Sequence, residues 1–353
     1  MVGGFGVAVR VLLALAGAAL LGAAALAVAG LQPLPALRAV VVGAAGDSFG
    51  IRHSLLQAVP ITLTALGVTL ALRANLFNLG GEGQIYLGAL AAVAVALGAR
   101  HLPGWLLAPL AVLVGALAGL VWGTIAGLLR ARLGLSEIIT TIMLNFVAFW
   151  VVSWLVHGPI QDPAAAGFPY TEPVTPAARL GAVGATVPVG AILAGLLAAV
   201  CWLLLDRSRA GLHIKDIGEG EPAASFAGLP VGRYVVAVLA FAGAMGGLAG
   251  AVELTGNQLR LSDGFSPGWG FDAIAVALIG RGTPVGTLAA GLFFGALRSG
   301  IDGAQVTAAV PAATAQIIQG GTVLLLVAAN SDVLARTLRR VGWAAWRRRA
   351  RPA

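Results

Sequence analysis

The sequence predicts an all-α membrane protein, a polytopic bundle of eight to ten transmembrane helices, with ten preferred. Hydrophobic residues make up 59% of the 353 residues, and charged residues make up only 10%. The mean hydropathy is +0.93, whereas a soluble domain carries roughly 25% charged residues because its surface faces water. This composition excludes a soluble globular protein, and it is also far too apolar for a disordered chain.

Stretches without Asp, Glu, Lys or Arg mark the expected spans, because a helix needs about 20 mostly apolar residues to cross a bilayer. Eight spans follow from these stretches, and the region 271–300 is ambiguous. No stretch is left for a separate soluble domain, so we expect one transmembrane domain over residues 1–353. The charge-free stretches cover residues 11–37, 53–72, 83–99, 101–129, 138–161, 180–205, 234–252, 282–297 and 303–331.

The first stretch contains a sequence that resembles a signal-peptidase site, Ala27-Val28-Ala29. The apolar run that precedes it begins at Val11 and is longer than the roughly 7–15 residues of a cleaved signal. Arg10 is the single positive charge before that run. We therefore expect an uncleaved first span.

The region 271–300 is interrupted by Arg281, Gly282 and Pro284. It predicts either two short spans or a helical hairpin that dips into the bilayer and returns. Irregular backbone at that depth is stable only where protein or a water-filled cavity satisfies its polar groups.

The distribution of Arg and Lys predicts which side of the membrane each loop faces. The chain has 22 basic and 14 acidic residues and a net charge of +8. With both termini in the cytoplasm, most basic residues, including a tail at 336–353, fall on the cytoplasmic side of a bacterial plasma membrane, as the positive-inside rule requires. Membrane topology therefore explains the positive charge without a nucleic-acid partner. The outer side keeps Arg38, Arg52, Arg100, Arg179, Arg260 and Arg298.

The sequence carries no pattern typical of a metal site or an enzyme. Cys201 is the single cysteine, so an internal disulfide is excluded. The histidines, His53, His101, His157 and His213, lie on separate loops and span ends. No acids, histidine and nucleophile group on one face, so we expect neither catalysis nor a bound metal or cofactor in this chain.

The polar loop at residues 206–233 is expected to contain a short helix. Pro222 suits the first residue of a short helix, and Glu219 and Glu221 are favourable near its positive end. Gly228 is a natural helix stop. A helix of six or seven residues is not stable alone in water, so we expect it to bind another surface. A solvated connecting loop is the alternative.

A glycine-rich segment follows the second span. The glycines within Gly80–Gly83 permit close backbone approach and positive φ, so we expect a bend or a broken helix there. A phosphate-binding loop is excluded because Gly-Lys-Ser or Gly-Lys-Thr does not follow. The polar side chains nearby either contact a solute or satisfy the backbone of the broken helix. These are Asn75, Asn78, Glu82 and Gln84.

Further polar residues lie within or beside apolar spans. Thr141 and Asn145 are four residues apart and share one helix face, where they either bond across helices or contact a solute. Glu253 and Asp272 either mark span ends or are functional carboxylates at bilayer depth. The glycines of Gly115–Gly123 and of Gly243–Gly250 are expected to let helices approach closely in lipid.

Four motifs together resemble the permease subunits of ATP-binding-cassette importers. The resemblance is to the simple sugar and nucleoside branch of the branched-chain amino acid/ribose permease superfamily, and it extends over about residues 55–330. Asp216 and Gly220 depart from the expected loop pattern. The motifs are Asn75–Gln84 with Ile85–Ala89, Ser136–Asn145, the loop Gly218 to Leu229, and Gly280–Gly286.

The resemblance implies a permease that imports a small polar solute, most readily nucleosides, with simple sugars as an alternative. It implies three partners: an ATP-binding-cassette subunit that binds ATP-Mg, a second homologous or identical permease subunit, and an extracytoplasmic solute-binding lipoprotein. An ATP-independent secondary transporter remains a further alternative. It would need intramembrane carboxylates, for which Glu82, Glu253 and Asp272 are available.

The resemblance also implies residue roles. In such permeases the short cytoplasmic helix docks into the ATPase subunit, and the Asn75–Gln84 segment contributes to the substrate path. Phe77, Tyr86 and Trp269 either stack on a base or anchor span ends at the membrane interface. The coupling residues are Lys215, Gly218, Glu219, Glu221, Ala223, Ala224, Phe226 and Gly228, and the substrate-path residues are Asn75, Phe77, Asn78, Glu82, Gln84, Thr141 and Asn145.

Overall fold

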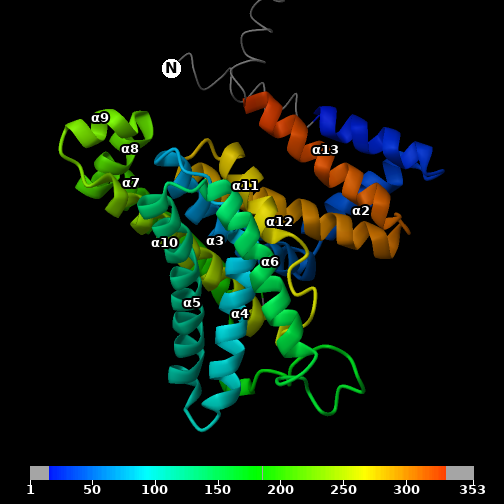
Figure 1. Cartoon of the computed structure of the whole chain (residues 1–353). Coiled ribbons are helices and arrows are strands. Elements are labelled where there is room, and N and C mark those ends of the chain that lie inside the picture. The colour runs from blue at the N-terminus through cyan, green and yellow to red at the C-terminus, as the bar shows by residue number, and fades with distance from the viewer. Residues whose placement is uncertain (1–15, 185, 331–353) are drawn as a thin grey trace, which may run out of the picture. The chain divides into compact units, whose positions relative to one another are not determined.

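A computed structural model describes residues 16–184 and 186–330 (Figure 1). Residues 51–296 form one compact unit, and the described residues before 51 and after 296 form a second. The expectation of one transmembrane domain over 1–353 includes residues outside the described part and stays a prediction.

The described residues are mostly helical, as predicted, and eight helices are long and apolar enough to cross a membrane. The preferred count of ten spans and the cytoplasmic termini stay predictions. The eight helices are α3 (Ser48–Arg73), α4 (Gly81–Gly98), α5 (Gly104–Leu133), α6 (Glu137–Val156), α7 (Val189–Arg207), α10 (Val231–Glu253, continued by the π-helix η2, Leu254–Gln258), α12 (Pro284–Thr307) and α13 (Ala312–Asn330).

The prediction of one continuous span at 11–37 is wrong for the residues that the structure describes. A helix Ala16–Val28 ends there, and α2 (Pro33–Ala45, 13 residues) begins after a turn. Gly30 in that turn has φ +77°, and Pro33 begins α2 without an N–H donor. Both helices belong to the smaller unit, where Leu26 and Ala36 pack with Ile301 of α12.

The region 271–300 contains one short helix and one long helix. α11 (Trp269–Ile279) has 11 residues and rises about 16 Å, half of a hydrocarbon core of about 30 Å. A turn with Arg281 at φ +56° and Gly282 at φ +61° follows. α12 then runs for 24 residues, beyond the predicted end of that span at residue 297. The two predicted alternatives are therefore replaced by a half-length helix followed by a full-length helix.

α5 and α10 pack along glycine rows in the larger unit (Figure 1). A Cβ added to Gly119 would lie 2.2 Å from the carbonyl oxygen of Gly243, and a Cβ added to Gly247 would lie 2.3 Å from that of Gly115. Real Cβ atoms do not approach backbone so closely, so the predicted close approach is confirmed. The structure adds that the two predicted glycine rows face each other.

One end of the larger unit carries the short helices α8 (Arg209–Glu219) and α9 (Glu221–Phe226) (Figure 1). Arg130, at the end of α5, lies 3.2 Å from Glu137 of α6 and 3.3 Å from Glu221 of α9. The Nε of Arg73 donates a hydrogen bond of 2.5 Å to the carbonyl oxygen of Gly282. Arg73 and Arg130 are among the basic residues that the charge pattern places on the cytoplasmic side.

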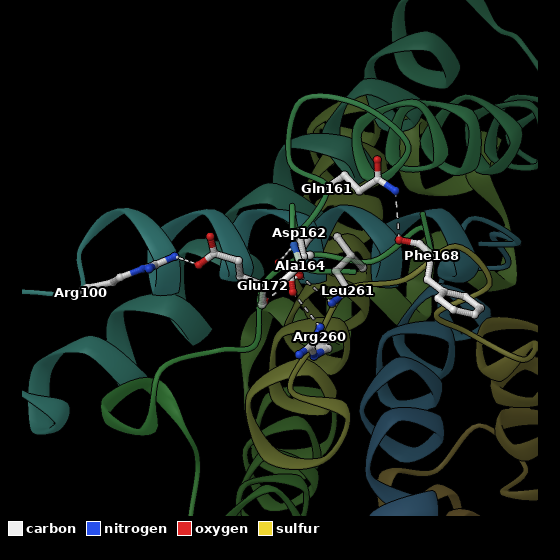
Figure 2. Close-up of polar contacts among 9 residues, drawn as sticks. Arg100, Gln161, Asp162, Ala164, Phe168, Glu172, Arg260 and Leu261 are labelled. Atoms are coloured by element: carbon white, nitrogen blue, oxygen red, sulfur yellow. Dashed lines mark hydrogen bonds and ion pairs between the residues drawn. The ribbon is translucent and has the colours of Figure 1, made fainter. Parts of the chain in front are cut away.

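The opposite end is built from the loop between α6 and α7, which contains the 3₁₀ helix η1 (Pro176–Ala178) and the strands β1 (Ala182–Val183) and β2 (Val187–Pro188). Figure 2 shows how side chains fasten this loop. Asp162 lies 3.1 Å from Arg260, and Glu172 pairs with Arg100. The loop is thus largely non-helical, as its number of prolines predicts, and the two ion pairs anchor it.

Candidate functional site

The chain is broken between α3 and α4. Residues 74–80 are not helical, and α4 begins at Gly81. A Cβ on Gly81 would lie 2.8 Å from the side chain of Thr64, which precedes the end of α3 by nine residues and thus by about 14 Å. α4 therefore begins near mid-span, so the predicted break is confirmed.

The glycines of this break serve close approach rather than positive φ. Gly80 has φ −83°, and the left-handed residue is Asn75, with φ +55°. A Cβ on Gly83 would lie 2.9 Å from the Cα of Asn145. The positive φ that the glycines permit is not used there, because the sharp turn lies before them, at the end of α3.

Asn78 and Gln84 bond to each other across the break. The Asn78 Nδ2 donates to Gln84 Oε1 at 3.1 Å, and the Gln84 Nε2 donates to Asn78 Oδ1 at 3.2 Å. The Gly80 N–H also donates to Asn78 Oδ1, at 3.0 Å. Both side chains are buried, so their groups satisfy the irregular backbone, one of the two roles that the sequence leaves open.

Two residues of α6 hold the same segment from outside. The Asn145 side chain accepts from the Gly83 N–H at 2.8 Å and donates to the Leu79 carbonyl at 2.7 Å. The Thr141 hydroxyl accepts from the Leu79 N–H at 3.3 Å. These bonds across elements are the packing role that the shared helix face predicts. Solute contact by these residues stays a prediction.

The first turn of α11 meets the first turn of α4. A Cβ on Gly270 would lie 2.2 Å from the backbone nitrogen of Glu82. The Gly270 N–H donates to Glu82 Oε2 at 2.8 Å, and the Trp269 N–H donates to the Ser266 hydroxyl at 3.2 Å. The unpaired N–H groups of a helix start are thus satisfied by side chains, and the Glu82 carboxyl lies where two positive helix ends converge.

A cavity of about 450 Å³ lies beside this junction, within the range of roughly 300–1,000 Å³ that is typical of small-molecule sites. Three residues named in the sequence analysis line it: Glu82, Asn145 and Tyr86. The remaining predicted path residues and two of the aromatic candidates do not. The complete lining is Glu82, Tyr86, Ile142, Asn145, Phe146, Phe149, Trp150, Ser266, Gly268 and Phe271.

The α6 aromatic residues of the cavity were not predicted, although the sequence contains a signal for them. Ile142 and Phe149 lie three and four residues from Asn145, so they share its face of the helix. Of the predicted stacking candidates, Phe77 is exposed elsewhere and Trp269 is buried. Following the helix face of Asn145 would have identified Phe149 as part of the aromatic wall.

The aromatic rings of the wall contact one another edge to face. The ring centroids of Tyr86 and Phe149 are 5.9 Å apart, and those of Phe149 and Trp150 are 5.4 Å apart. The Tyr86 hydroxyl accepts from the Ser266 N–H at 3.3 Å. Edge-to-face contacts are a favoured aromatic geometry, so the wall is held in place while part of it faces the cavity.

The other two predicted carboxylates lie apart from the cavity lining. Glu253 is the last residue of α10 and is buried; its Oε1 accepts from the Asn257 side chain at 2.7 Å. Asp272 lies in the first turn of α11. Among the described residues 16–184 and 186–330, no three His, Cys, Asp or Glu side chains form a group that could hold a metal ion.

The predicted short helix is present as α9, one residue earlier than expected. It ends as predicted: Gly228 has φ +83°, and the Leu229 N–H donates to the Ala224 carbonyl at 3.1 Å, a Schellman-type stop. Phe226 is 94% exposed, whereas Ala224 is buried. The helix thus presents an aromatic side chain at the end of the larger unit.

The helix α8, which precedes α9, was not predicted. The Lys215 ammonium lies 2.8 Å from Asp206, and a Cβ on Gly218 would lie 2.2 Å from the carbonyl oxygen of Arg73. α8 therefore packs directly on the end of α3. Its buried Ile214 packs with residues of α3, α7 and α10, such as Leu70, Leu205 and Val235. The predicted coupling residues are divided between the two helices: Lys215, Gly218 and Glu219 lie in α8, Glu221, Ala223, Ala224 and Phe226 lie in α9, and Gly228 follows α9.

The matches to known proteins cover both the cavity region and the helices α8 and α9. The family described as the permease component of the branched-chain amino acid transport system matches residues 50–327. A glucose ABC transporter permease protein of Haloferax volcanii is 37% identical over 317 residues, which cover 87% of this chain and 83% of the relative. A guanosine ABC transporter permease protein of Bacillus subtilis is 32% identical over 321 residues (88% and 89%). A nucleoside ABC transporter permease protein of Lactococcus lactis is 31% identical over 299 residues (80% and 81%).

Proposed function

The chain belongs to the family of permease components of the branched-chain amino acid transport system, and from this premise we propose that it forms the membrane path of an ATP-driven importer for nucleosides. It is a multi-pass protein of the cell membrane. The observation that carries the ATP-driven part is α9, a six-residue helix whose Phe226 is 94% exposed. α9 packs on the larger unit through the buried Ala224, and the exposed ring of Phe226 is available to a partner surface.

Three partners follow from this proposal. An ATP-binding-cassette subunit that holds ATP-Mg binds α8 and α9 in the cytoplasm. A second permease subunit, homologous or identical, completes the path. An extracytoplasmic solute-binding lipoprotein delivers the solute to the opposite end, where the loop shown in Figure 2 lies. Both termini and the basic tail are proposed to lie in the cytoplasm, where the positive-inside rule favours them.

Two observations support nucleosides as the solute. Two of the three relatives described above are a guanosine and a nucleoside permease. The cavity beside Glu82 also combines aromatic rings with a carboxyl and an amide, and such groups suit a flat base with a polar edge. The glucose permease relative, at 37% identity, supports a simple sugar as the second candidate.

Replacement of Phe226 tests the coupling role. In the intact transporter in proteoliposomes, we expect Phe226→Ala to reduce ATP-dependent uptake of radiolabelled inosine at least tenfold. ATP hydrolysis should lose its dependence on the solute, because α9 no longer fills its partner surface. Membrane level and thermal stability should not change, since the side chain is exposed.

Leu113→Ala is the matched control, because Leu113 is a 55% exposed apolar residue on α5, away from α9. It should leave uptake unchanged. Normal uptake by Phe226→Ala at normal membrane levels would rule out the coupling role. Uptake that follows an ion gradient and ignores ATP would instead support a secondary transporter.

A further inference from the structure

The cavity beside Glu82 is lined by both polar and aromatic side chains. The Glu82 carboxyl comes from the start of α4, the Ser266 hydroxyl from the segment before α11, and the Asn145 amide from α6. α6 also contributes the rings of Phe149 and Trp150. A bound molecule therefore meets both hydrogen-bonding groups and flat apolar surfaces.

The Glu82 carboxyl retains accepting capacity toward the cavity. Its hydrogen-bonding neighbours in the structure are the Gly270 N–H, at 2.8 Å from Oε2, the Ser266 hydroxyl and the Gly268 backbone. A carboxyl group keeps acceptor capacity on its two oxygens whether or not it is ionised, so a donor of a bound molecule can still be accepted. Glu82 is half-buried and lines the cavity, which places this capacity at the cavity.

The combination of aromatic rings and a carboxyl in one cavity suits a nucleobase. A base has two apolar faces and polar edges, and bases stack on aromatic side chains. Trp150 is 66% exposed, so its ring is available for such stacking.

We propose that this cavity binds the transported solute, and that the Glu82 carboxyl selects nucleosides whose base offers an N–H donor. The inference rests on the proposed function and specifies its solute. Carboxylates accept hydrogen bonds from the N–H groups of bases in other recognition sites. A base whose donor is replaced by a methyl group leaves the carboxyl unpaired and is rejected.

The substitution Glu82→Gln distinguishes recognition of the base by this side chain from a purely structural role. The glutamine Oε1 can still accept from the Gly270 N–H, so the helix junction keeps its bond, while an NH₂ group replaces an acceptor. Binding is measured on the intact transporter in nanodiscs with inosine, with 1-methylinosine, which lacks the N1–H, and with 2-methylinosine, which keeps it. The isolated solute-binding lipoprotein is measured separately with the same three nucleosides.

In the unaltered transporter, inosine and 2-methylinosine should bind at least about tenfold more tightly than 1-methylinosine. Glu82→Gln should reduce this preference to less than about threefold at an unchanged melting temperature. An unchanged preference in Glu82→Gln would overturn the inference, while inosine uptake would still uphold the proposed function. Uptake of glucose but not inosine by the unaltered transporter would overturn both.

Trp150→Leu keeps the inference testable if Glu82→Gln does not assemble. Because Trp150 is largely exposed, its replacement should preserve the fold. Loss of stacking should weaken binding of inosine and 1-methylinosine equally, by about tenfold. Unchanged inosine binding by Trp150→Leu would show that the solute does not occupy this cavity.

Discussion

Two helix contacts in the larger unit both depend on close approach at a glycine, but their surroundings differ. In the α5–α10 contact, a Cβ on Gly119 would lie 2.2 Å from the carbonyl oxygen of Gly243. In the α4–α11 contact, a Cβ on Gly270 would lie 2.2 Å from the nitrogen of Glu82. The first contact joins two through-going helices. The second joins two helix starts and borders a cavity of about 450 Å³.

The difference arises from the backbone. A through-going helix satisfies its own N–H and C=O groups, so glycine only brings α5 and α10 closer together. A helix start leaves N–H groups unpaired, and within a membrane these need partners from the protein. The α4–α11 junction therefore recruits Glu82, Ser266 and Asn145. Glycines at helical spacing predict that two helices lie close together, whereas broken helices predict a polar site.

The largest effect on stability is expected from Asn145→Leu, which tests whether the junction depends on polar bonds. It leaves the Gly83 N–H and the Leu79 carbonyl without their side-chain partners. Each buried unpaired group costs about 1–3 kcal/mol, so the unfolding free energy should fall by about 2–6 kcal/mol. Thermal unfolding of the purified transporter measures this loss.

Thr140→Val is the control for that substitution, because the Thr140 hydroxyl bonds to the Glu137 carbonyl within its own helix. It should change the melting temperature little. Equal losses in the two variants would mean that the polar bonds across the break contribute nothing specific, and the contrast between the two contacts would fail.

A smaller effect is expected from Gly247→Ala, which tests whether the α5–α10 contact depends on space alone. The added methyl would lie 2.3 Å from the Gly115 carbonyl oxygen, so the helices must separate. Overpacking of this kind costs about 1–3 kcal/mol. Gly195→Ala in α7 is the control, because a Cβ there meets nothing within 4 Å, and its melting temperature should not fall.

The smallest effect on stability is expected from Gly270→Ala, although its effect on transport should be large. Its methyl also overlaps backbone, at Glu82, but α11 borders the cavity and can move into it, so the cost should be near the lower limit of about 1 kcal/mol. Because the Glu82 carboxyl moves with the junction, uptake should fall about tenfold. A strong loss of stability, combined with normal transport by the protein that remains folded, would contradict this prediction.

Several structural features could be predicted from the sequence because their causes are local. Gly228 ends α9 because it adopts φ +83°, and the glycine-rich segment before α4 marks the break. The first span could not be predicted from apolar length, since Gly30 and Pro33 divide it. α8 was missed because its burial depends on packing with several other helices, among them α3, which is distant in the sequence.

The sequence alone determined that the protein is a helical membrane protein, that its second span is followed by a break, and that a short helix lies in its polar loop. These properties depend on composition and on residues near in sequence. Only the tertiary structure brought α11 to α4, 188 residues away at the Gly270–Glu82 bond, and placed the aromatic face of α6 beside them. A cavity exists only between elements, so its lining is decided by which helix starts meet and not by any one segment.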